Sequence, residues 1–117
     1  MLAHGIYLDA HDKILIADRG AQVAHSPSSN LFLGSGLFDW PGAPFNVSLA
    51  SDVGGGTTLS LPRNMLDAYK VQALRGARLT AWTALHASTR GAAEALQLGG
   101  EIGGLSVGQT ADLCVWD

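Results

Sequence analysis

The sequence predicts an α/β fold in which helices cover a parallel β-sheet. Three short β-prone runs, at residues 1–5, 21–25 and about 45–50, alternate with helical patterns. The expected order is strand, helix, strand, broken helix, strand and then helices, and such alternation is typical of parallel sheets. Three strands cannot close a barrel, which takes eight.

The composition indicates a folded chain that is lightly charged. Hydrophobic residues make up 47% and charged residues 15% of the 117 residues, and the net charge is −3. These values exclude disorder and argue against a nucleic-acid partner. The single cysteine excludes an internal disulfide, and no apolar run is as long as a membrane helix. We therefore expect a cytoplasmic protein without a membrane partner.

Local signals in the first half place one helix and one long loop. Asp9 is a suitable N-cap for a helix over about residues 10–19, which Gly20 would end. Residues 26–30, with the sequence Ser-Pro-Ser-Ser-Asn, have the composition of a loop. Two prolines within residues 40–44 prevent a long helix there.

The second half predicts helices and a late strand. A helix over about residues 61–75 would place one apolar face inward, formed by Leu61, Met65, Leu66, Tyr69 and Ala73. Thr80 can cap the next helix, and a further helical segment follows it. Glycines interrupt residues 99–108, and the run 111–116 favours a strand. The only plausible domain boundary follows residue 98.

Three polar residues stand at the ends of predicted strands. His4 and His25 end the first two, and Asp52 follows the third, just before Gly54, Gly55 and Gly56. The carboxyl ends of parallel strands share one edge of the sheet, so these side chains could converge on a zinc ion or on a proton-transfer site. We expect about 4 to 6 Å between the polar atoms of His4 and Asp52. Taken one at a time, each residue is better explained as structural, and the glycine run lacks the spacing of a phosphate-binding loop.

Longer strings in the sequence resemble the guanine deaminases of the amidohydrolase superfamily. Residues 23–38, VAHSPSSNLFLGSGLF, are similar to the family segment AHCPxSNLxLGSGxF. Residues 2–5 and 51–56 look like its AHG and TDVGGG strings, and residues 66–71 and 89–98 match two further regions. Residues 102–113 are similar to a tail, IGxLxPGKxADxV, that many amidohydrolases share.

This resemblance implies a partial (β/α)8 barrel and a zinc-dependent reaction. Residues 1–98 would hold barrel strands six to eight with their helices, and residues 99–117 the first return into a small β-sandwich. The reaction would be the hydrolytic deamination of guanine to xanthine and ammonia. Asp52 would bind zinc and accept a proton, His4 would be catalytic, and His25 and Asn30 would lie near the substrate. Full-length members of the family usually form homodimers.

The sequence also departs from the family pattern. The His-x-His pair of the first barrel strand and the histidine and glutamate of the fifth are absent, and a catalytic zinc takes about three protein ligands. We therefore expect the C-terminal part of a guanine deaminase, which is inactive alone and self-associates through unpaired strand edges. The alternatives are another amidohydrolase deaminase or chlorohydrolase, of triazine or thioadenosine type, and a non-enzymatic remnant or interaction module.

Overall fold

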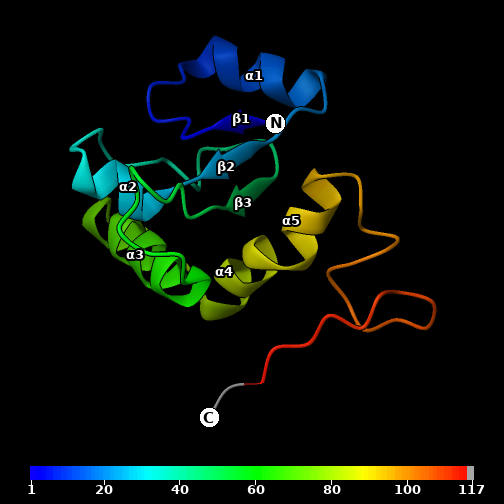
Figure 1. Cartoon of the computed structure of the whole chain (residues 1–117). Coiled ribbons are helices and arrows are strands. Elements are labelled where there is room, and N and C mark those ends of the chain that lie inside the picture. Colours follow the sequence, from blue (N-terminus) through cyan, green and yellow to red (C-terminus); the bar gives the residue numbers. More distant parts are fainter. Residues whose placement is uncertain (116–117) are drawn as a thin grey trace.

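A computed structural model describes residues 1–115 of the chain and confirms the predicted alternation of strands and helices (Figure 1). Eight elements follow one another in it. They are β1 (Leu2–Ala3), α1 (Ala10–Asp18), β2 (Val23–His25), α2 (Pro27–Phe32), β3 (Val47–Leu49), α3 (Leu61–Leu74), α4 (Ala81–Ser88) and α5 (Arg90–Ala95).

The three strands form one parallel sheet in the order β1-β2-β3. Ala3 pairs with Ala24 and His25 with Leu49, and the backbone amide of His4 donates to the carbonyl of Ala24 at 2.9 Å. Because parallel strands end at the same edge, the segments that follow β1, β2 and β3 all leave the sheet on one side. α1 lies beside β1, whereas α3, α4 and α5 form an arc beside β3 (Figure 1).

The helix ends follow the predicted capping signals. Asp9 caps α1 through a capping box, in which its carboxylate accepts from the amide of Asp12 at 2.8 Å. The Thr80 hydroxyl accepts from the amide of Thr83 at 3.1 Å and so caps α4. Both caps satisfy amides that have no partner within the helix, which is why the sequence alone could place these two starts.

The prediction of a loop at residues 26–30 is wrong, because this segment opens the short helix α2. Pro27 occupies the first turn, where a missing backbone donor costs nothing and the fixed φ suits a helix. The amide of Asn30 donates to the carbonyl of Ser26 at 3.0 Å. Serine and asparagine are poor helix formers on their own, so tertiary burial of this turn outweighs their local preference.

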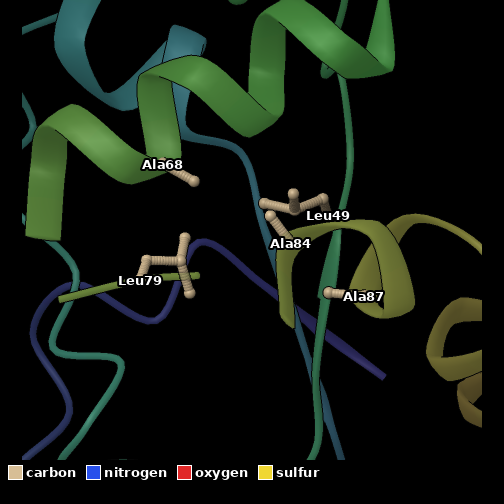
Figure 2. Packing of buried hydrophobic residues seen from close by; sticks show 5 residues of the cluster. All are labelled: Leu49, Ala68, Leu79, Ala84 and Ala87. Carbon is tan, nitrogen blue, oxygen red and sulfur yellow. The ribbon is translucent and has the colours of Figure 1, made fainter. Parts of the chain in front are cut away.

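The core between the sheet and the helices is built largely from small residues. Its buried members come from β3, α3, the segment before α4, and α4 itself (Figure 2). They are Leu49, Ala68, Leu79, Ala84 and Ala87. Trp40 and Met65 pack against this cluster while remaining partly exposed. Alanine contacts let the helix backbones approach the sheet closely.

The apolar face predicted for α3 is largely wrong, since Met65 packs against the core but Leu66, Tyr69 and Ala73 are exposed. The buried residues of this helix are Asn64, Ala68, Val71 and Gln72. Leu66 and Tyr69 are 52% and 51% exposed, and they line an open cavity of about 740 Å³ between α3 and the start of α4. The amides of Asn64 and Gln72 face inward because they form hydrogen bonds there, with the carbonyls of Ser60 and Phe38 respectively.

The tail beyond α5 contains no strand within residues 99–115. The predicted strand at 111–116 is therefore not found over 111–115, and Trp116 lies outside the described residues. The tail forms a loop instead, which is closed where the side-chain amide of Gln109 donates to the carbonyl of Gly99 at 2.9 Å. Residues 111–115 are exposed and have no neighbouring strand with which to pair. None of the described helices is long and apolar enough to cross a membrane.

Candidate functional site

The candidate site lies at the edge of the sheet where the three strands end. His4 follows β1, His25 ends β2, and Asp52 stands three residues after the end of β3. Asn30 reaches the same region from α2, which begins two residues after β2. The topology thus brings together all four residues that the sequence singled out.

The backbone at His4 and Asp52 is unusual. Their φ angles are 64° and 45°, and they are two of the three non-glycine residues with positive φ in residues 1–115. This left-handed conformation costs about 1–2 kcal/mol for a residue with a side chain, and such residues cluster at functional sites. It turns each side chain away from the direction that a continuing strand would give it.

His4 and Asp52 face one another across a shallow cavity. The His4 Nε2 and Asp52 Oδ2 atoms are 3.8 Å apart, slightly closer than expected, and each side chain is 42% exposed. The cavity has a volume of about 490 Å³ and is also lined by Leu8, Leu33 and Ser35. An imidazole and a carboxylate are therefore presented together to whatever enters from solvent.

Asn30 connects His4 to His25. The Oδ1 atom of Asn30 is 2.8 Å from His4 Nδ1, and its Nδ2 atom is 3.4 Å from His25 Nδ1. Asn30 is only 1% exposed and His25 is fully buried. In this structure both side chains therefore lie behind His4, and neither is among the residues that line the cavity.

His25 is enclosed by aromatic rings. Its ring stacks on Phe38 with 4.7 Å between the centroids, and Trp40 meets it edge-on at 6.0 Å. Burial, and then the charge of His4, lower the pKa of His25 to about 3. His25 is consequently neutral at physiological pH. Its Nε2 atom is buried and has no hydrogen-bond partner within the described part of the chain.

The glycine loop positions Asp52 against α2. The Ser28 hydroxyl lies 2.8 Å from the hydroxyl of Thr57 and accepts from the Thr57 amide at 3.1 Å. A Cβ atom on Gly55 would lie 2.8 Å from Ser29 Oγ and 3.0 Å from Asp52 Oδ2. A side chain at position 55 would therefore displace the Ser29 hydroxyl and the Asp52 carboxylate, since the loop backbone passes directly beside them.

The donor set fits part of a zinc site. Among residues 1–115 there is no group of three or more His, Cys, Asp or Glu side chains that could hold a metal ion. The Asp52 carboxylate is nevertheless a suitable zinc ligand, and the His4 imidazole lies 3.8 Å from it. Since catalytic zinc takes about three protein ligands, the remaining ones would have to come from other residues.

Several parts of this site could not be predicted from sequence alone. The bridging position of Asn30, the rings around His25 and the Ser28–Thr57 hydrogen bonds all join segments that are distant along the chain. The motif that contains Asn30 gave a signal, but its apparent loop composition concealed the helix that aims the side chain.

Comparison with known proteins places this chain in one family. The Amidohydrolase family model matches residues 1–117, so the chain belongs to the amidohydrolase family.

Within that family, the chain is similar to guanine deaminases and to other purine-related deaminases. It is 35% identical over 120 residues to a guanine deaminase of Escherichia coli (strain K12) and 38% identical over 121 residues to a 5-methylthioadenosine/S-adenosylhomocysteine deaminase of Syntrophobacter fumaroxidans. These matches cover 100% and 97% of this chain but 27% and 28% of the relatives. The chain thus spans about a quarter of their length.

Solved structures give the same result. An E. coli guanine deaminase superposes with a TM-score of 0.92 at 36% identity, covering 94% of this chain and 26% of that one. An adenosine deaminase from Xanthomonas campestris, whose structure holds zinc, gives 0.85 at 32% identity, covering 94% and 27%. The packing of strands and helices in this chain is therefore that of one section of these enzymes.

Proposed function

We propose that this chain supplies part of the active site of a zinc-dependent guanine deaminase, which converts guanine and water to xanthine and ammonia. The observation that carries the proposal is the meeting of His4 and Asp52, 3.8 Å apart, over an open cavity at the strand ends. The similarity to guanine deaminases over the whole chain supports the choice of reaction.

The reaction requires groups that move protons. The attacking water must lose a proton and the departing amine must gain one. We assign to Asp52 the acceptance of the first proton and a bond to the metal, and the exposure of its carboxylate to the cavity supports this role. His4 would contact the reacting centre through Nε2. Zinc, when bound, lowers the pKa of a coordinated water to about 7.

We further propose that β1, β2 and β3 correspond to strands six, seven and eight of an eight-stranded amidohydrolase barrel. Residues 1–98 would then form the barrel section, and residues 99–117 would begin the return to a second, smaller domain. The parallel order of the sheet and the TM-score of 0.92 to a guanine deaminase structure support this assignment. The strand edges at β1 and β3 would pair with neighbouring strands in such a barrel.

A thioadenosine-type deaminase is the second candidate. The S. fumaroxidans relative, at 38% identity over 97% of this chain, is as similar in sequence as the guanine deaminases. Both reactions remove an amine from a purine ring and need the same pair of proton-moving groups. The two candidates differ in the substrate, not in the roles proposed for His4 and Asp52.

The test is a segment exchange. The residues of the E. coli guanine deaminase that align with this chain are replaced by residues 1–115 of this chain, and the purified chimera is assayed with zinc for xanthine formation. We expect guanine turnover that is abolished by Asp52→Asn, because asparagine is a poor zinc ligand and cannot accept the proton. Trp82→Ala, at an exposed position on α4, serves as a control that should retain the activity.

Two outcomes would contradict the proposal. A folded, zinc-loaded chimera that deaminates methylthioadenosine but not guanine would favour the second candidate. Guanine turnover that survives Asp52→Asn would remove Asp52 from the chemistry altogether.

A further inference from the structure

Asn30 lies between two imidazole rings and presents a different atom to each. Its Oδ1 atom is 2.8 Å from His4 Nδ1, and its Nδ2 atom is 3.4 Å from His25 Nδ1. An amide oxygen can only accept a hydrogen bond, and an amide nitrogen can only donate one. The orientation of this single amide therefore decides which nitrogen of each histidine carries the proton.

The position of Asn30 is fixed by its surroundings. The Asn30 side chain is 1% exposed, its backbone amide donates to the carbonyl of Ser26 at 3.0 Å, and its carbonyl accepts from the amide of Ser35 at 2.9 Å. The His25 ring beside it packs against both Phe38 and Trp40. Burial and these two backbone hydrogen bonds thus hold Asn30 in place beside the two rings.

We propose that Asn30 is a positioning residue that holds neutral His4 in the tautomer protonated at Nδ1, and that it imposes protonation at Nε2 on His25. His4 then directs an unprotonated Nε2 toward Asp52, ready to accept a proton or a cation at the site. The relevance of this tautomer to catalysis rests on the proposed function. Asn30 would act by setting the protonation of His4 and would not contact the substrate.

The separation between His4 and Asp52 supports this tautomer. If the amide were reversed, His4 would carry its proton on Nε2 and would be expected to donate it to the Asp52 carboxylate. The observed Nε2 to Oδ2 distance of 3.8 Å is too long for such a hydrogen bond. Two acceptors facing one another across that distance leave room for a donor or a cation between them.

The experiment measures the tautomers directly in this chain, without metal or substrate. Long-range proton–nitrogen NMR correlations on the 15N-labelled protein, recorded above the titration range of histidine, distinguish protonated from unprotonated ring nitrogens. We expect His4 to be protonated at Nδ1 and His25 at Nε2. The exposed His11 and His86 serve as internal references and should show the Nε2-protonated form that free histidine prefers. His4 protonated at Nε2, or a rapid mixture of the two forms, would overturn the proposal.

A pair of variants tests whether Asn30 is the cause. In Asn30→Leu, which removes the acceptor at similar volume, His4 should shift to the Nε2-protonated form. Asn64→Leu removes another fully buried asparagine, on α3, and should leave His4 unchanged. An unshifted His4 in Asn30→Leu, or an equal shift in both variants, would overturn the proposal. If Asn30→Leu does not fold, the measurement on the unmodified chain still decides whether His4 is protonated at Nδ1, as the proposal requires.

These readouts are independent of the deamination reaction. A chimera without guanine turnover would contradict the proposed function and leave the tautomers as measured. Conversely, an active chimera with His4 protonated at Nε2 would contradict only the positioning role of Asn30.

Discussion

Gln72 and Asn64 form a matched pair of buried amides on α3 whose loss should have very different effects. Gln72 is 1% exposed and Asn64 is fully buried. The Gln72 Nε2 atom donates to the carbonyl of Phe38 at 2.9 Å, and its Oε1 atom accepts weakly from the amide of Trp40 at 3.4 Å. Asn64 instead donates at 3.1 Å to the carbonyl of Ser60, which stands at the N-cap position of the same helix. The Oδ1 atom of Asn64 has no partner within the described residues.

The magnitudes follow from what each change leaves behind. Gln72→Leu leaves the buried Phe38 carbonyl without a donor, and an unsatisfied buried group costs about 1–3 kcal/mol. Because the weaker hydrogen bond from the Trp40 amide is lost as well, we expect the free energy of unfolding to fall by about 2–3 kcal/mol in total. Asn64→Leu leaves the Ser60 carbonyl with the backbone amide of residue 64 and also removes an unpaired acceptor, so a loss below about 1 kcal/mol is expected.

The assay is urea unfolding followed by tryptophan fluorescence, at a concentration where size-exclusion chromatography shows one species. Gln72→Leu should also loosen the segment that carries Phe38 and Trp40, and with it the enclosure of His25. Equal destabilisation by both variants, or a Gln72→Leu change of less than about 0.5 kcal/mol, would refute the reasoning from hydrogen-bond satisfaction.

Three further predictions concern the site and the strand edges. Because the pKa of His25 is lowered from 6.5 to about 3, the folded state binds fewer protons than the unfolded state between these values. The contribution of His25 to stability is therefore full above pH 6.5 and falls by about 1.4 kcal/mol per pH unit toward pH 3. His25→Leu should remove this slope from denaturation midpoints measured across the range. Gly55→Ala should displace the Asp52 carboxylate and lower chimera activity by about 10- to 100-fold, whereas Gly100→Ala, which meets no neighbour within 4 Å, should not. The chain alone, supplied with zinc and guanine, should form no xanthine, because residues 1–115 contain no complete metal site. It should elute as a self-associated species, because β1 and β3 are open edges of their sheet. Xanthine formation or elution as a compact monomer would contradict these expectations.

The sequence by itself determined the features that depend on neighbouring residues. The capping side chains of Asp9 and Thr80 act within one turn, so their helices were predicted close to their observed starts. The alternation of elements predicted a parallel sheet, and parallel strands end at a common edge. That was sufficient to expect His4 and Asp52 close together, and the two side chains do converge.

Only the tertiary structure decided which faces are buried and how the polar residues pair. The local signals of residues 26–30 favour a loop and the most apolar stripe of α3 favours burial, yet the first is a helix and much of the second is exposed. The buried face of α3 is the one on which Ala68 packs against Leu49 of β3 and the Gln72 amide bonds the carbonyl of Phe38.

The same reason explains why the sequence indicated the residues of the site but not their arrangement. The sequence indicated His4, His25, Asn30 and Asp52, but it could not show that Asn30 lies between the two histidines. Nor could it show that His25 is buried against Phe38 or that His4 and Asp52 adopt positive φ angles. These properties come from contacts between segments that are distant along the chain, such as the 26 residues that separate His4 from Asn30. No local sequence pattern predicts such contacts, because they form only after the sheet has brought the strand ends together.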